Sequence, residues 1–187
     1  MQHAPNLVLV GPMGSGKSSI GRRLAARLGL AFVDADHEIE AQAGTSIATI
    51  FECAGEAAFR AREHAVLARL LAAEGSVIAT GGGAVLDPRT RALLRERGFV
   101  VHLHADVPQQ LARLARDRSR PLLAGADREQ VLRRLAELRG PLYAEVAHLR
   151  FDTASLDPAE ATARLGHLLE AHWRPATPAS FGNGRSA

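Results

Sequence analysis

The sequence predicts an α/β fold in which a parallel sheet is covered by helices on both faces. Short segments rich in Val, Leu, Ile and Phe recur along the chain, and most of them are separated by stretches with apolar residues at helical spacing. Strand and helix therefore alternate. Because each strand is followed by a helix before the next strand begins, this order favours parallel pairing with helices on both sides of the sheet.

Five segments have the composition of buried strands, and we expect each of them to form one strand of the sheet. They are residues 6–10, 31–36, 76–80, 99–105 and 148–153. The chain has no internal repeat and no low-complexity segment before residue 173, so we expect residues 1–173 to fold as a single domain.

Two predicted helices carry recognisable start and stop signals. Asp157 and Pro158 are a cap and a first helical residue, which predicts a last helix at about 158–173. Asp87 and Gly98 bracket another helix in the same way. After Trp173 the composition changes to Pro, Gly, Ser and Asn without periodicity, which predicts a disordered tail over residues 174–187.

Composition excludes several classes of protein. The 187 residues are 47% hydrophobic and 23% charged, which is enough to bury a core. The net charge is only +3, the arginines are scattered, and aromatic residues make up 4%, so a nucleic-acid-binding protein is disfavoured. The single cysteine, Cys53, forms no internal disulfide, and no apolar run is long enough to cross a membrane, so we expect a cytoplasmic protein without membrane partners.

Neither the cysteine nor the histidines suggest a chemical role. Cys53 lies in an apolar stretch without a charged neighbour, so we expect it in the core. The eight histidines show no spacing typical of metal ligands, and His102 and His104 alternate along one predicted strand. We expect the histidines to be structural or to face solvent.

A phosphate-binding loop follows the first strand directly. Residues 11–18, GPMGSGKS, match G-x-x-x-x-G-K-[ST], and a helical pattern begins after them. The backbone N–H groups of such a loop and of the helix start bind phosphate, Lys17 would meet the β and γ phosphates, and Ser18 would hold Mg²⁺. We expect the loop to bind ATP through Gly14, Ser15, Gly16, Lys17, Ser18 and Ser19.

Lys17 is the only lysine beside 22 arginines. A guanidinium is planar and forked and does not replace a compact ammonium among phosphates, so this distribution favours a specific need for lysine here. The loop alone does not separate kinases from motors or switches. The rest of the chain has to decide what is done with the nucleotide.

Candidates for binding a second substrate follow the next two strands. Asp34 and Asp36 stand at the end of a predicted strand, where one could face the metal and the other an incoming hydroxyl, although Asp36 could instead cap the next helix. Gly81, Gly82 and Gly83 end the following strand and would let the backbone approach a ligand closely, or form a plain turn.

One further spacing makes these candidates specific. Arg60 and Glu63 are three apart, an ordinary surface ion pair if taken alone, but Leu67 and then the segment 77–85, VIATGGGAV, follow at fixed distances. Together with GPMGSGKS and the DAD segment, this pattern resembles the signature of shikimate kinases over about residues 6–173. The resemblance implies a three-layer α/β/α P-loop kinase fold with a central five-stranded parallel sheet, a substrate-binding helical segment at about 35–75 and a mobile lid at about 115–127.

The resemblance also implies roles for individual residues. The shikimate-binding positions would be Asp36, Arg60, Gly81, Gly82, Gly83 and Arg139, with the arginines on the carboxylate and Asp36 on the hydroxyls. In the lid, Arg120 would contact the transferring phosphate, which makes Lys17, Asp36 and Arg120 the catalytic residues. Around the adenine the family places residues that correspond to Arg113 and Pro158. Because the third strand ends without an aspartate, Asp34 would hold Mg²⁺ beside Ser18.

Two of these implied roles compete with simpler interpretations. Arg139 could instead be a cation at the C-terminal end of a helix that begins near residue 128, where a positive charge is favourable. Arg113 reads nearly as well as part of a solvated helix face.

The function implied by the resemblance is transfer of the γ-phosphoryl group of MgATP to the 3-hydroxyl of shikimate, with Mg²⁺ as the cofactor and ATP and shikimate as the partners. A gluconate-type or nucleoside monophosphate kinase is the nearest alternative, and a nucleotide-dependent switch or nucleic-acid-binding module is a more distant one. Two arginines, aspartates and a triple glycine suit a small carboxylated polyol better than a nucleobase. Without a long exposed apolar stripe we expect a monomer.

Overall fold

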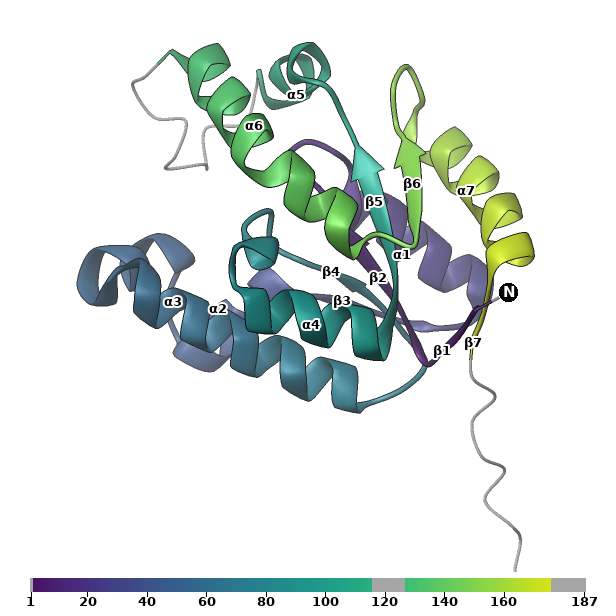
Figure 1. The fold of residues 1–187 in the computed structure, drawn as a ribbon, viewed down its shortest axis with the longest axis horizontal. Coiled ribbons are helices and arrows are strands. Elements are labelled where there is room, and N and C mark those ends of the chain that lie inside the picture. The colour runs from purple at the N-terminus through teal and green to yellow at the C-terminus, as the bar shows by residue number, and fades with distance from the viewer. Residues whose placement is uncertain (1, 116–126, 176–187) are drawn as a thin grey trace, which may run out of the picture.

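The computed structural model describes residues 2–115 and 127–175 of the chain (Figure 1). Its centre is a five-stranded parallel sheet in the order β3-β4-β2-β5-β6. The strands are β2 (Asn6–Val10), β3 (Ala31–Asp34), β4 (Ser76–Ala79), β5 (Gly98–His104) and β6 (Leu149–Asp152). All five predicted strands are present, so the expected fold class is confirmed.

The order of the strands places the phosphate loop at the centre of the molecule. β2 lies in the middle of the sheet, with β4 on one side and β5 on the other, so the order of connection changes direction there. Ligands of open α/β sheets bind beyond the carboxyl ends of the strands at such a switch point. The segments that leave β2, β3 and β4 meet at this edge.

Helices form the two outer layers (Figure 1). The helices α1 and α7 cover one face of the sheet, while α3, α4 and α6 cover the other. Their bounds, with those of the helices at the rim, are α1 (Lys17–Leu28), α2 (Ala35–Ala43), α3 (Ile47–Ala72), the 3-10 helix η1 (Ala84–Leu86), α4 (Pro88–Arg97), α5 (Val107–Leu114), α6 (Arg128–Val146) and α7 (Pro158–His172).

Strand β2 shows why two layers form. Its side chains alternate between the faces, because successive residues of a strand point in opposite directions. Leu7 and Leu9 are fully buried against the layer that contains α1 and α7. Val8 and Val10 are fully buried against α3, α4 and α6. A continuous apolar run is therefore required at the centre of the sheet.

Two smaller apolar clusters build the parts around the phosphate edge. Ile39, Ile50, Phe59 and Val66 pack α2 and α3 together, so the segment expected to bind substrate has its own core. The second cluster, of Met13, Leu114 and Leu132, packs α5 and α6 against the phosphate loop.

The ends of three helices test the predicted start and stop signals. Asp87 and Asp157 accept hydrogen bonds from the first N–H groups of α4 and α7, as their sequence context predicts. Helix α6 does not end at Arg139, because it continues through Gly140 and Pro141 to Val146. Arg139 is therefore inside a helix and 8% exposed, so its interpretation as a terminal cation is wrong.

The expected core position of Cys53 is also wrong, since its side chain is exposed. Cys53 lies in the first part of α3, before a break at Gly55, where φ is 78°. In this part the side chains that pack inward are Ile47, Ile50 and Phe51, at helical spacing. Cys53 falls outside that spacing and faces solvent.

The two ends of the described chain pair with each other. β1 (Gln2–Ala4) and β7 (Trp173–Pro175) form a two-stranded parallel sheet, and Trp173 Nε1 donates to the Ala4 carbonyl at 3.0 Å. Arg174 and Pro175, the start of the expected tail, thus belong to a strand. Residues 176–187 lie outside the described residues. Within the described part of the chain, no helix combines the length and the apolar character that a membrane span needs.

Candidate active site

The phosphate loop between β2 and α1 depends on three glycines in conformations that other residues avoid. Gly11, Gly14 and Gly16 have φ angles of 146°, 76° and 91°. Gly11 also lies against β5, so closely that a Cβ atom would come within 2.3 Å of the Leu103 carbonyl oxygen. Only glycine combines this conformation with this contact.

The loop is arranged to receive an anion. Gly16 precedes α1 without a side chain that could cap the helix, so the first backbone N–H groups are left for a ligand. Lys17 Nζ donates to the carbonyl oxygens of Gly11 and Pro12, at 2.9 Å each, which folds the ammonium back over the loop. Ser19 Oγ donates to the Gly16 carbonyl, and Ser15 Oγ is buried without a hydrogen-bond partner among the described residues. The residues expected to bind phosphate are thus together.

Ser18, on helix α1, and Asp34, at the end of strand β3, are brought together. Ser18 Oγ donates to Asp34 Oδ2 at 2.6 Å, although the residues belong to α1 and β3. The other oxygen of Asp34 accepts from the Asp36 N–H at 3.1 Å and so caps α2. The alternative in which Asp36 caps this helix is therefore wrong.

These oxygens fit a magnesium ion. Mg²⁺ prefers hydroxyl, carboxylate, phosphate and water oxygens and seldom uses an all-protein cage. Ser18 and Asp34 would supply two such oxygens, and within residues 2–115 and 127–175 there is no group of three His, Cys, Asp or Glu side chains that could hold a metal.

The second half of the site is a cluster of charged side chains around the triple glycine. A Cβ atom on Gly81 would lie 2.6 Å from Asp36 Oδ1 and 2.9 Å from Glu63 Oε1. On Gly83 it would lie 2.4 Å from a terminal nitrogen of Arg60. Gly81 and Gly83 thus allow charged side chains to approach the backbone closely, which a plain turn does not require.

Arg139 reaches this cluster from α6. A Cβ atom on Gly82, between the two glycines just described, would be 3.5 Å from a terminal nitrogen of Arg139 and 3.6 Å from the Gly11 carbonyl of the phosphate loop. The cluster of Asp36, Arg60, Glu63 and Arg139, which we call the acceptor cluster, therefore adjoins the phosphate loop. Three helices, α2, α3 and α6, supply its residues.

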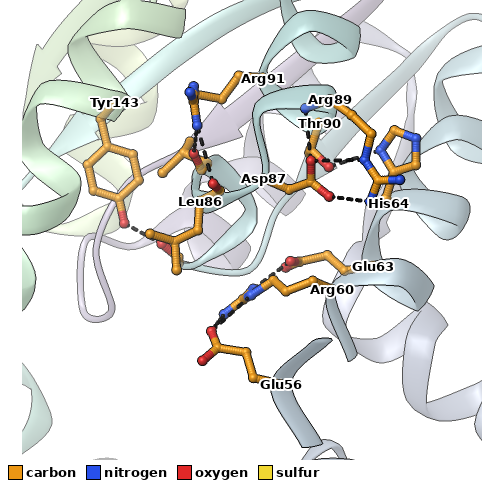
Figure 2. Close-up of polar contacts among 12 residues, drawn as sticks. Glu56, Arg60, Glu63, His64, Leu86, Asp87, Arg89, Thr90, Arg91 and Tyr143 are labelled. Atoms are coloured by element: carbon orange, nitrogen blue, oxygen red, sulfur yellow. Dashed lines mark hydrogen bonds and ion pairs between the residues drawn. The ribbon is translucent and has the colours of Figure 1, made fainter. Parts of the chain in front are cut away.

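Glu63 is the member whose role the sequence did not indicate. Its side chain is 2% exposed and accepts from Arg60 at 2.5 Å, so the pair is not the ordinary surface pair that the spacing suggests (Figure 2). Burial raises the pKa of Glu63, and the guanidinium of Arg60 opposes this shift. Its second oxygen, Oε1, has no hydrogen-bond partner within the described chain. Glu56 and Glu63 both pair with Arg60, and only the tertiary packing around them makes one exposed and the other buried. The sequence does not give this packing.

Arg60 is held between two carboxylates. Glu63 bonds one side of the guanidinium, and Glu56 bonds the other at 3.2 Å (Figure 2). Arg60 also borders an open cavity of about 430 Å³ between α3 and the start of α4. The remaining residues that line the cavity are Glu56, Leu86, Asp87, Pro88 and Arg89.

Arg113, expected beside the adenine, makes contacts in two directions. Its guanidinium donates to the Gly14 carbonyl at 2.9 Å and to the side chain and carbonyl of Thr153 at 2.9 and 2.6 Å. Arg113 thus joins the phosphate loop to the segment after β6, and it is at the same time exposed, as a residue on a solvated helix face is. Pro158 begins α7 a few residues further and is exposed.

The remaining catalytic candidate is Arg120, in the expected lid. Arg120 and nearly all of the expected lid, residues 115–127, lie outside the described residues. α5 and α6 flank this segment, and their packing on Met13 puts its two ends next to the phosphate loop.

Comparison with known proteins agrees with this geometry. Residues 13–170 match the family model described as "Shikimate kinase". A shikimate kinase from Xanthomonas euvesicatoria pv. vesicatoria is 60% identical over 180 residues, which are 96% of this chain and 100% of the relative.

Among solved structures, shikimate kinase from Acinetobacter baumannii in complex with shikimate superposes with a TM-score of 0.86 at 45% identity, covering 90% of this chain and 94% of that one. A gluconokinase from Sinorhizobium meliloti gives 0.54 at 22% identity over 91% of this chain and 98% of that one, which shows a shared fold alone. The family match and the identity over nearly the whole length lead to one conclusion: the chain belongs to the shikimate kinase family.

Proposed function

We propose that the protein transfers the γ-phosphoryl group of MgATP to the 3-hydroxyl of shikimate, giving shikimate 3-phosphate and ADP. The observation that carries the proposal is the acceptor cluster, because two arginines and an aspartate converge on the triple glycine beside the phosphate loop. Arginines pair with a carboxylate, and an aspartate orients hydroxyls. A small hydroxylated acid supplies both groups.

On the nucleotide side, the chain's contribution is positioning and charge. The uncapped start of α1 and the loop N–H groups hold the phosphates, and Lys17 balances their charge. Ser18 and Asp34 would hold Mg²⁺, which when bound neutralises phosphate oxygens. Arg113 and Pro158 would border the adenine. We assign to Arg120, in the expected lid, the contact with the transferring phosphoryl group.

On the acceptor side, Asp36 would accept a hydrogen bond from the attacking hydroxyl, since it is the second residue of α2 and its side chain lies beside Gly81. Arg60 and Arg139 would bind the carboxylate of shikimate, and Glu63 keeps the Arg60 guanidinium in place. The triple glycine would approach the ring directly. Transfer then requires only that the hydroxyl and the γ-phosphorus be aligned.

The test is ADP release by the purified protein with MgATP and, in separate reactions, shikimate, gluconate, AMP, CMP or no acceptor. We expect release with shikimate alone, and phosphorus NMR of the product should show coupling to the proton on carbon 3. Release with gluconate would favour the gluconate-type alternative. ADP release that does not depend on an acceptor would agree with the nucleotide site but would overturn the assignment of the acceptor site.

A monomeric, cytoplasmic state without nucleic-acid or membrane partners stays part of this proposal. The +3 net charge and the scattered arginines of the sequence support it. Light scattering of the purified protein with and without substrates tests the monomer. A mass of twice 19.9 kDa would contradict it.

A further inference from the structure

Tyr143 is a buried polar residue that has no role in the proposed phosphoryl transfer. It lies on α6, one turn after Arg139, and is 3% exposed. It is the only tyrosine of the chain. Its hydroxyl donates to the Gly82 carbonyl at 2.5 Å, and Figure 2 shows it directed at the turn that carries the triple glycine. A buried tyrosine usually has such a partner, but here the partner is the middle residue of the acceptor segment.

The carbonyl groups of the triple glycine show why this partner matters. The Gly81 carbonyl accepts from the Ala84 N–H at 3.2 Å, and the Gly83 carbonyl accepts from the Leu86 N–H at 3.0 Å. Both are therefore held by the η1 turn itself. The Gly82 carbonyl is instead bound by Tyr143.

A peptide group between two glycines is the least constrained by its own side chains. Because the peptide is planar, holding the Gly82 carbonyl also fixes the direction of the Gly83 N–H, which points the opposite way. One hydrogen bond from α6 thus sets the orientation of the peptide group at the centre of the acceptor cluster.

Tyr143 also lies beside the Arg139 side chain. Burial raises the pKa of Tyr143 to about 12, and the guanidinium of Arg139 opposes this shift. Arg139 is 8% exposed, and within the described residues its Nε has no partner and no salt bridge neutralises it. A buried guanidinium with an unsatisfied N–H is costly, which suits a site that a carboxylate completes.

We propose that the Tyr143 hydroxyl is the positioning group that couples the Gly82 carbonyl to Arg139, and that this coupling sets the affinity of the acceptor site for its carboxylated substrate. The inference rests on the proposed function for the identity of that substrate.

The surroundings of Tyr143 hold its ring in one place. The ring of His102, on β5, lies 5.0 Å from it between centroids, at an interplanar angle of 30°. Pro12, Met13 and Arg139 line a space of about 10 Å³ beside the tyrosine, which is no larger than a single water molecule needs. The hydroxyl therefore cannot move far without losing Gly82.

The experiment compares the wild type with Tyr143→Phe, which removes the hydroxyl and keeps the ring. We expect the KM for shikimate to rise about 10-fold, the cost of roughly 1.4 kcal/mol for one misplaced buried hydrogen bond. The KM for MgATP should stay within twofold, and saturating shikimate should restore kcat. A lower kcat with both KM values unchanged would overturn the positioning role.

Thr90→Val is the matched control. It also deletes a hydroxyl that is 1% exposed, and the partner of this hydroxyl, His64 Nδ1 at 3.0 Å, is outside the acceptor cluster. Tyr143→Phe and Thr90→Val should lower the thermal stability by similar amounts. If both variants raise the KM for shikimate, the effect of Tyr143→Phe is a general loss of stability, and the positioning role is wrong. If the wild type itself shows no shikimate-dependent ADP release, the proposed function fails, and shikimate binding measured by calorimetry without nucleotide still tests the coupling.

A double-mutant cycle with Arg139→Lys tests the route of the effect. If Tyr143 acts through Arg139, the two substitutions together should raise the KM for shikimate by much less than the product of their separate effects. Strictly multiplicative effects would overturn the coupling.

Discussion

The phosphate loop and the acceptor cluster meet at one edge of the sheet but are built in opposite ways. The loop consists of consecutive residues between β2 and α1, and its contacts are short in sequence, such as Lys17 to the Gly11 carbonyl. The acceptor cluster brings Asp36, Glu63 and Arg139 from three helices to the triple glycine. The loop therefore works through backbone geometry, whereas the cluster works through charged side chains whose mutual positions depend on the whole fold.

The largest expected effect concerns the acceptor cluster. Asp36→Asn removes the charge that orients the attacking hydroxyl, so we expect kcat with shikimate to fall by about 10² to 10⁴-fold. MgATP affinity, measured by calorimetry, should stay nearly unchanged because the loop does not use this side chain. Glu38→Gln, a change in the same turn of α2 at a residue paired with Arg69, is the control and should keep full turnover. Unchanged turnover of Asp36→Asn would remove Asp36 from the mechanism.

An added methyl group should be most damaging in the loop. In Gly11→Ala the new Cβ meets a backbone oxygen, Leu103 O at 2.3 Å, and the φ of 146° is unfavourable for alanine. Neither problem is relieved by a side-chain movement. We expect the affinity for MgATP to fall about 10- to 100-fold and the free energy of unfolding to fall by about 2 kcal/mol. Wild-type affinity in this variant would show that the loop is more pliable than its geometry indicates.

The same methyl group should have a smaller and different effect in the acceptor cluster. In Gly83→Ala the Cβ meets the end of the flexible Arg60 side chain, and φ is −98°, which alanine tolerates. The protein should fold, and displacement of the guanidinium should raise the KM for shikimate about 5- to 10-fold. Gly140→Ala, where nothing lies within 4 Å of the added atom, is the control and should change neither KM. An unchanged shikimate KM in Gly83→Ala would place Arg60 away from the substrate.

This contrast also explains what the sequence could predict. The five strands, the capped helices α4 and α7 and the phosphate loop depend on local patterns, and all were expected within a few residues. The burial of Glu63 depends on the packing of α3 against the triple glycine, which no local pattern reports. For the same reason Arg139 was expected at the end of a helix that in fact continues, because Gly140 and Pro141 are local signals that tertiary packing overrides.

The β1–β7 pair shows a related limit. Three-residue strands at the two ends of a chain have no pattern of their own. Their pairing is secured by Trp173, which is 3% exposed and packs against Phe99 at 6.3 Å between ring centroids. Composition after residue 173 resembles that of a tail, so the strand was not expected. A long-range contact again decides the local structure.

The last expected effect leaves substrate binding aside and is a pH dependence of stability centred on His102, which lies on β5 beside Tyr143. The residue is 5% exposed on β5, and burial, together with the nearby charges of His104, Arg150 and Lys17, lowers its pKa from 6.5 to about 4. Between these two values the unfolded chain binds a proton that the folded chain excludes. The free energy of unfolding therefore falls as the pH drops from 6.5 towards 4, by at most about 3 kcal/mol.

Denaturant unfolding followed by the fluorescence of Trp173, the only tryptophan, measures this effect at pH 7.5, 6 and 5. His102→Asn loses volume and is expected to be less stable at every pH, but its stability should fall less steeply below pH 6.5 than that of the wild type. His167→Asn makes the same change at a side chain that is 72% exposed and should keep the wild-type slope. If the free energy of unfolding falls equally steeply with pH in all three proteins, His102 binds its proton in the folded state as well. The surroundings of His102 would then be more open to water than its burial implies.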